Sequence, residues 1–148
     1  MPFVWDDKYR LGIPEIDRQH QTLLLLLNKA FDFYSHDAGG MAQEALRQRV
    51  LKDLAGLREF VRAHFATEET FMDRYDYPDM NRHCREHAKL LEITAQWEEK
   101  TTGAKDFSPH EWIEIILAWY DYHVRHIDRE LGEFLRNNGE FKAAKAIS

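Results

Sequence analysis

Four stretches of this chain repeat apolar residues every three to four positions, and groups of helix-breaking residues separate them. The breaks fall at Pro14, at residues 37–40, 75–78 and 101–104, at Ser108 with Pro109, and at residues 137–139. Ser108 before Pro109 is typical of a helix start, with the serine as N-cap and the proline at the first helical position. No stretch shows the strict alternation of apolar and polar residues that predicts a β-strand.

Amphipathic helices with short connections predict an all-α fold, an antiparallel up-down-up-down four-helix bundle. The length of 148 residues suits one domain, residues 1–148. We expect residues 1–12 to pack against it as an N-terminal arm and residues 137–148 to form a short C-terminal tail.

The composition argues against several classes of function. Acidic residues outnumber basic ones by 26 to 20, and the net charge of −6 disfavours general nucleic-acid binding. The longest apolar run, residues 23–27, is far shorter than the roughly 20 residues that span a bilayer. The first residues also lack the pattern of a secretory signal, so we expect a cytoplasmic protein without membrane insertion. Cys84 is the only cysteine, which excludes an intrachain disulfide and a cysteine-based metal site.

Polar side chains interrupt the apolar stripes of all four predicted helices. Burying an imidazole or a carboxylate without a partner costs free energy, and a single buried histidine usually finds an ordinary partner in the core. Five histidines and a glutamate on the inward stripes call for one shared partner, and a metal ion is the obvious one. These residues are His20, His64, Glu68, His83, His87 and His123.

The spacing of these residues supports a metal site. His64 and Glu68 lie four positions apart, as do His83 and His87, so each pair projects from one face of a helix. One such pair is weak evidence because it arises by chance in helical proteins. Two pairs with two further inward histidines are much stronger evidence.

The fourth predicted helix offers competing ligands. In an ideal helix His123 lies inside the apolar arc and His126 at its margin. Asp128 lies about 90° from the centre of that arc. It reaches the core only if the helix is locally widened, as in a π-bulge, or if the side chain leans back. Glu130 is nearer in angle, and spacing alone does not choose between the two carboxylates.

The number of ligands predicts two metal ions. Five imidazoles and one or two carboxylates exceed the needs of one ion, whereas carboxylates that bridge two ions would use them all. Nitrogen and oxygen ligands without a thiolate suit iron, zinc or manganese. Carboxylate-rich di-iron bundles space Glu and His by three, and this chain has a histidine-rich version with a spacing of four.

These residues resemble a known family, the hemerythrins, and in particular its single-domain bacterial members. The resemblance runs from about Trp5 to Leu135. It rests on residues 12–20 (GIPEIDRQH), on residues 64–72 (HFATEETFM), and on Tyr77, Pro78, His83, His87, Trp119, His123 and Asp128.

The resemblance implies a non-haem di-iron centre whose irons share an oxo or hydroxo bridge. It implies that His83, His87 and His123 hold one iron. His20 and His64 would hold the other iron and leave an open position for dioxygen.

The resemblance also implies which carboxylates bridge the irons, namely Glu68 and Asp128. The family spaces the histidine and aspartate of its fourth helix by five residues. That spacing selects His123 with Asp128 and demotes His126 and Glu130.

The function implied by the resemblance is reversible dioxygen binding, for carriage, storage or delivery to an oxygen-consuming enzyme. We expect a binding protein rather than an enzyme, because no acid, base or nucleophile outside the ligand set is evident. One alternative is a di-iron oxidase, peroxidase or nitric-oxide-consuming enzyme, which sustained turnover would reveal. The other is an oxygen or redox sensor, which would need a partner protein that binds only one state.

Two positions depart from the family pattern. Val124 replaces an isoleucine that is common there, and Tyr120 replaces an aliphatic residue, so a phenol is expected near the oxygen pocket. Other residues have simpler interpretations as solvated or packing side chains. We expect His36, His110 and Glu69 in solvent, His126 at an edge, and Cys84, Trp97, Trp112 and Trp119 in packing roles.

Overall fold

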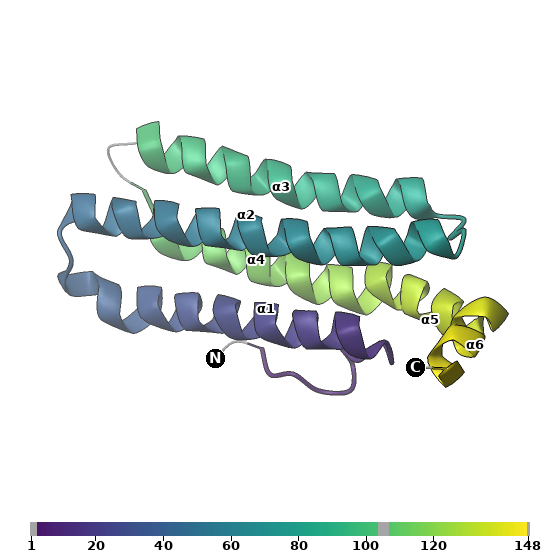
Figure 1. Cartoon of the computed structure of the whole chain (residues 1–148). Coiled ribbons are helices and arrows are strands. Elements are labelled where there is room, and N and C mark those ends of the chain that lie inside the picture. Colours follow the sequence, from purple (N-terminus) through teal and green to yellow (C-terminus); the bar gives the residue numbers. More distant parts are fainter. Residues whose placement is uncertain (1–2, 104–106, 148) are drawn as a thin grey trace.

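The computed structural model describes residues 3–103 and 107–147. Four long helical segments form the expected antiparallel bundle, running up, down, up and down (Figure 1). The segments are α1 (Pro14–Asp32), α2 (Gln43–Arg74), α3 (Met80–Gly103) and α4 (Pro109–Tyr122); α4 continues through a π-helical segment (His123–Asp128) into α5 (Arg129–Asn137). The described ranges contain no β-strand.

The breaks in the sequence set most of the helix ends. Pro14 and Pro109 stand in the first turns of α1 and α4, where the missing N–H of proline leaves no hydrogen bond unmade. Ser108 occupies the N-cap position of α4 with extended backbone, although its side chain makes no capping hydrogen bond. The break predicted at residues 101–104 begins later in the structure, because α3 continues to Gly103.

A buried carboxylate of α1 holds the end of the arm that precedes this helix. Asp17 accepts hydrogen bonds from the backbone N–H groups of Leu11 (2.8 Å) and Gly12 (3.0 Å). Gly12 has a φ of 83°, a conformation that favours glycine. Gly132 lets the arm approach α5 closely, since a Cβ at that position would lie 3.0 Å from the Cβ of Leu11.

The C-terminal tail is more regular than the sequence predicted. A final helix, α6 (Gly139–Ile147), follows the break and lies at the end of the bundle (Figure 1). The side-chain oxygen of Asn138 accepts a hydrogen bond from the N–H of Phe141 (3.0 Å), as an N-cap residue does. The buried ring of Phe141 packs edge-on against Tyr75, which holds α6 to the end of α2.

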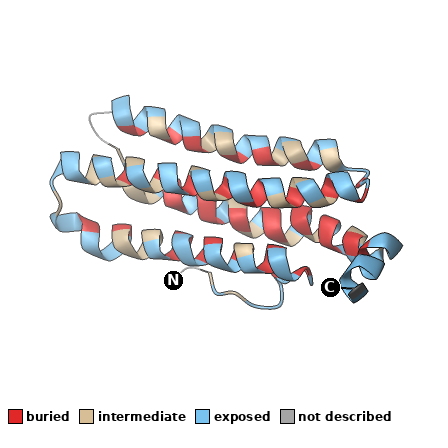
Figure 2. Ribbon diagram, in the orientation of Figure 1, coloured by how far each residue is buried: buried red, intermediate tan, exposed pale blue. Residues whose placement is uncertain are grey.

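The buried faces of the long helices turn toward one another in the interior of the bundle (Figure 2). The apolar side chains there form two separate clusters. On α1, Ile16 belongs to one cluster and Leu23 to the other, with His20 between them. On α2, Met72 belongs to the same cluster as Ile16, and Val61 belongs to the same cluster as Leu23. A polar layer therefore crosses the middle of the bundle. Among the described helices, none has the length and apolar character needed to cross a bilayer.

Candidate metal centre

The structure brings all seven side chains selected from the sequence into this polar layer. They come from every long segment of the bundle, and none exposes more than 3% of its surface. Two groups of candidate ligand atoms form, each with all its atoms within 4.8 Å of one another. One group comprises Glu68, His83, His87, His123 and Asp128, and the other comprises His20, His64, Glu68 and Asp128.

A π-helical turn decides which carboxylate of the fourth segment faces the core. The helix widens over His123–Asp128, so residues five apart face the same way. Asp128 is fully buried, and its Oδ1 lies 2.9 Å from Nε2 of His123. His126 and Glu130 are both exposed, and they meet Tyr122 and Arg82 on the surface instead.

The oxygens of Glu68 divide the histidines of the layer into two sets. Oε1 faces Nε2 of His87 at 2.9 Å and Nε2 of His83 at 3.5 Å. Oε2 faces Nε2 of His64 at 3.5 Å and Nε2 of His20 at 3.6 Å. One carboxylate thus presents a different oxygen to each set.

Asp128 makes the same division. Its Oδ1 lies 2.9 Å from Nε2 of His123 and 3.0 Å from Nε2 of His83, whereas Oδ2 lies 3.0 Å from Nε2 of His20. Together the two carboxylates therefore separate a three-histidine set, His83, His87 and His123, from a two-histidine set, His20 and His64. Two carboxylates that each span two sets of nitrogens have the arrangement of bridging ligands.

The buried charges shift the pKa values of the layer in opposite directions. Burial by itself would raise the pKa of Glu68, yet the surrounding imidazoles hold it well below its usual range. The pKa of Asp128 is lowered in the same way, against burial and the charge of Glu68. Both side chains are therefore carboxylates at neutral pH, the form that binds metal.

Three imidazoles respond differently to the same surroundings. Burial lowers the pKa of His20 and His83, but the adjacent carboxylates outweigh it and raise the values to about 9 and about 10. Burial dominates at His64 and lowers its pKa to about 4. Without a metal ion, protons on two imidazoles would therefore balance the two buried carboxylates.

The residues of this layer fit a metal centre. Buried polar atoms normally make hydrogen bonds, and exceptions call for an explanation. Within the described ranges, several inward atoms face one another without hydrogen-bond geometry: Nε2 of His20, His83 and His123, Oε2 of Glu68, and both carboxylate oxygens of Asp128. Metal ions would satisfy these lone pairs together, and nitrogen and oxygen ligands without thiolate suit iron, zinc or manganese.

A glutamine that the sequence analysis did not single out orients one of the histidines. Oε1 of Gln19 lies 2.6 Å from Nδ1 of His64, and Nε2 of Gln19 donates to the hydroxyl of Thr67 (3.1 Å). Since the amide N–H₂ faces Thr67, the amide oxygen accepts the Nδ1–H of His64. Nε2 of His64 then keeps its lone pair toward the layer, as a metal ligand requires.

Glu69 and Cys84 lie behind another histidine. Oε2 of Glu69 is 3.6 Å from Nδ1 of His87, and the thiol of Cys84 donates to Oε1 of the same carboxylate (3.3 Å). The side chain of Glu69 is 38% exposed, so it is less accessible to solvent than we expected. Burial raises the pKa of the Cys84 thiol to about 11, so this cysteine is not a reactive thiolate at neutral pH.

Aromatic rings surround the three-histidine set. Phe65 stacks on His87 with ring centroids 3.8 Å apart, and Trp119 stacks on His123 at 4.4 Å. Tyr120 is fully buried and meets the ring of His20 edge-on at 6.2 Å. Its hydroxyl donates to the backbone carbonyl of the same histidine (2.8 Å), so the phenol has a fixed partner.

The remaining candidates lie away from the layer. His36 is exposed. His110 is partly exposed and bonds to Ser35 and Glu114 at the start of α4. Trp97 and Trp112 belong to the apolar core, and Val124 is buried within it.

The sequence matches one family over most of its length. The family model described as "Hemerythrin HHE cation binding domain" matches residues 11–136. The chain is similar to a bacteriohemerythrin of Clostridium acetobutylicum, with 24% identity over 86% of this chain and 97% of that protein. It is similar to a bacteriohemerythrin of Methylococcus capsulatus, with 28% identity over 80% of this chain and 85% of that protein.

Solved structures give the same result. A crystal structure of wild-type hemerythrin superposes with a TM-score of 0.76 and 25% sequence identity. The match covers 90% of this chain and 97% of that one.

Proposed function

The chain belongs to the hemerythrin family, and on that premise we propose that it binds dioxygen reversibly at a non-haem di-iron centre. The observation that carries the proposal is the division of both carboxylates between two sets of histidines. A single ion would not require this division. Two ions that share Glu68 and Asp128 would be ligated by all of these inward nitrogen and oxygen atoms.

The two sets assign the ligands of each iron. In this proposal His83, His87 and His123 hold one iron. His20 and His64 hold the other, which has fewer protein ligands and therefore room for dioxygen. When bound, the iron pair would supply the electrons that reversible dioxygen binding needs.

The side chains around the iron pair would serve binding rather than turnover. Gln19 would hold His64 with its Nε2 toward the iron, and the rings of Phe65 and Trp119 would shield His87 and His123, the ligands of the other iron, from water. A surround from which water is excluded would disfavour loss of the oxygen in a reduced form. We therefore propose an oxygen carrier, store or donor to an oxygen-consuming enzyme, acting in the cytoplasm.

Metal analysis followed by an anaerobic oxygen titration tests this proposal. We expect two irons per chain and a visible absorption band that appears with oxygen and disappears under vacuum. Irons that oxidise once, without a reversible adduct, would favour the enzyme or sensor alternatives. Zinc, or no metal after growth with ample iron, would refute the di-iron centre.

A pair of variants in the fourth segment tests the ligand assignment. His123→Ala removes an inward nitrogen, so the paired-iron spectrum should disappear. His126→Ala is the matched control, because this histidine is exposed three residues away, and it should leave the spectrum intact. The opposite result would show that the fourth segment is assigned incorrectly.

A further inference from the structure

A chain of oxidisable aromatic rings runs from the polar layer to the surface. Tyr120 meets the ring of His20 edge-on, with the ring centroids 6.2 Å apart. Tyr9 lies 5.6 Å from Tyr120, and Trp5 stacks on Tyr9 at 5.7 Å. Each ring is therefore in contact with the next. Tyrosine and tryptophan are the aromatic side chains that give up an electron most readily, so this chain of contacts is also a route for electrons.

The two ends of this chain differ in exposure. Tyr9 and Tyr120 are fully buried, whereas Trp5 is partly exposed and lines a surface groove between the arm and α1. The arm is held at this groove, because Nδ2 of Asn28 donates to the backbone carbonyl of Phe3 (2.7 Å). A small molecule in solution can therefore reach the indole but not the two phenols.

The middle ring has an acceptor for its proton. The hydroxyl of Tyr9 donates to Oδ1 of Asp121 (2.7 Å), whose Oδ2 accepts a hydrogen bond from Arg125. A phenol becomes strongly acidic when it is oxidised, so an adjacent carboxylate takes its proton. The ammonium of Lys8 lies 5.0 Å from the centroid of this ring and repels positive charge on it. Loss of an electron from Tyr9 is therefore favoured when the proton leaves with it.

The innermost ring lacks such an acceptor. The hydroxyl of Tyr120 donates to the backbone carbonyl of His20 (2.8 Å), and a carbonyl oxygen is a far weaker base than a carboxylate. A radical formed on this chain is therefore more stable on Tyr9, and the ring of Tyr120 is the contact across which the electron passes to His20.

Other oxidisable rings beside the layer do not continue outward. Trp119 stacks on His123 at 4.4 Å. Tyr77 meets His83 edge-on at 6.3 Å. The remaining ring contacts of these two side chains within residues 3–103 and 107–147 are with phenylalanine, which is far harder to oxidise.

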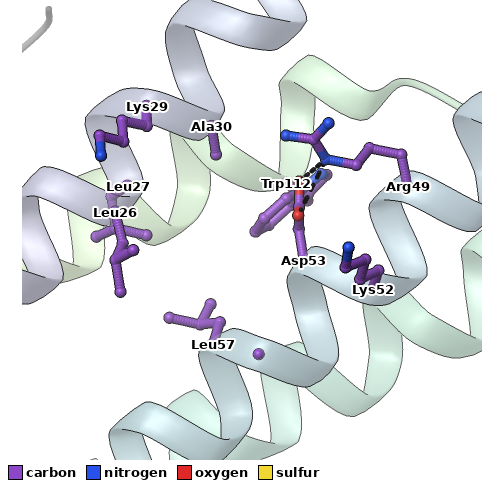
Figure 3. Close-up of a pocket in the computed structure, with 10 residues that line it drawn as sticks. Leu26, Leu27, Lys29, Ala30, Arg49, Lys52, Asp53, Leu57 and Trp112 are labelled. Atoms are coloured by element: carbon purple, nitrogen blue, oxygen red, sulfur yellow. Dashed lines mark hydrogen bonds and ion pairs between the residues drawn. The ribbon is translucent and has the colours of Figure 1, made fainter.

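A similar tyrosine and aspartate pair lies outside the layer. The groove between α1 and α2 contains Trp112 beside Asp53 (Figure 3). Trp112 meets the ring of Tyr34, whose hydroxyl donates to Asp53. In the part of the chain that the structure describes, neither of these rings meets a histidine of the layer, so this pair serves as a matched control.

We propose that Trp5, Tyr9 and Tyr120 form an electron-transfer path from the surface to the two-histidine set of the polar layer. The path would supply electrons when a hydroperoxide oxidises the centre, so that a reductant in solution is consumed rather than the ligand histidines. That use rests on the proposed iron centre, whereas the path itself does not.

The electrons and protons of this path balance. Tyr9 gives one electron toward His20, and its phenolic proton moves to Asp121. Trp5 then gives an electron to Tyr9, to which Asp121 returns the proton. Ascorbate, a one-electron donor, reduces Trp5 and releases one proton. Two such cycles supply the two electrons and two protons that convert hydrogen peroxide to two water molecules.

Pulse radiolysis of zinc-loaded protein tests the outer half of the path, since zinc has no redox chemistry. Azide radicals oxidise exposed tryptophan in preference to tyrosine, and time-resolved absorption separates the indolyl radical from the phenoxyl radical. We expect a phenoxyl signal that grows as the indolyl signal decays. Trp5→Phe and Tyr9→Phe should each lose this growth, whereas Tyr34→Phe should keep it. No growth in the unaltered protein, or growth that survives in Tyr9→Phe, would overturn the proposal.

Mixing of iron-loaded protein with hydrogen peroxide, followed by freezing and EPR spectroscopy, tests the inner half. We expect a tyrosyl radical that Tyr9→Phe abolishes and Tyr120→Leu strongly reduces. Trp5→Phe should prolong the radical, because its route to the surface is lost, and Tyr34→Phe should change nothing. An equal radical yield in Tyr120→Leu at equal iron content would refute the path.

Iron content is measured on every sample of this second experiment. Protein without iron would count against the di-iron centre and leave the radiolysis result to decide the path. Fully loaded protein that gives no tyrosyl radical would count against the path alone.

Discussion

Removal of metal should make the stability of this protein strongly dependent on pH between 7 and 9. In the folded apoprotein the pKa of His20 is about 9 and that of His83 about 10, because two buried carboxylates favour the imidazolium forms despite desolvation. In the unfolded chain both imidazoles have a pKa of about 6.5. The folded state therefore binds more protons than the unfolded state throughout this range.

The sign and size of the effect follow from proton linkage. Groups whose folded pKa is raised contribute stability that is complete below pH 6.5 and is lost as the pH rises through the folded pKa. With folded values of about 9 and 10, the two histidines together lose on the order of 4 kcal/mol between pH 7 and pH 9. Such a loss is a large fraction of the roughly 5–15 kcal/mol that stabilises a typical domain.

Urea unfolding of apoprotein at several pH values, followed by circular dichroism, measures this loss. The Cys84→Ser background is preferable, because a thiol whose pKa burial raises to about 11 adds a loss of the same sign near the upper end of the range. Metal-loaded protein is the control, since nitrogens bound to metal carry no proton and the dependence should nearly vanish. An apoprotein of constant stability from pH 7 to pH 9, or an equal loss in the loaded protein, would refute the reasoning.

Three further predictions concern single side chains. Glu68→Ala should lose paired-metal binding measured by elemental analysis, because both sets of nitrogens lose the oxygen that faces them; full occupancy would contradict the bridging role. Gln19→Leu leaves the Nδ1–H of His64 without its acceptor and should weaken metal affinity about 10- to 100-fold in a chelator competition, whereas Gln19→Glu keeps an acceptor and should bind nearly normally. Tyr120→Phe removes a buried hydrogen bond and should lower the free energy of unfolding by about 1–3 kcal/mol with unchanged metal content; an unchanged urea midpoint would argue against this contact.

Local patterns in the sequence were sufficient to predict the bundle and most of the polar layer. Helical periodicity depends on residues three and four apart, so the apolar stripes and the positions of Pro14 and Pro109 already indicate four antiparallel helices. The same periodicity selected five histidines and Glu68 as inward residues, because polar side chains on an apolar stripe are visible without knowledge of their partners. All of them are buried in the structure.

The tertiary structure decided the features that depend on backbone irregularity or on distant contacts. Ideal helical geometry left Asp128 and Glu130 as alternative ligands. The π-helical segment orients the side chain of Asp128 toward the core. The hydrogen bond between Gln19 and His64 joins residues 45 positions apart, and no spacing rule within one helix could reveal it. The helical periodicity and the composition of the sequence thus determined which side chains face the core. The packing of one helix against another decided which atoms of those side chains meet.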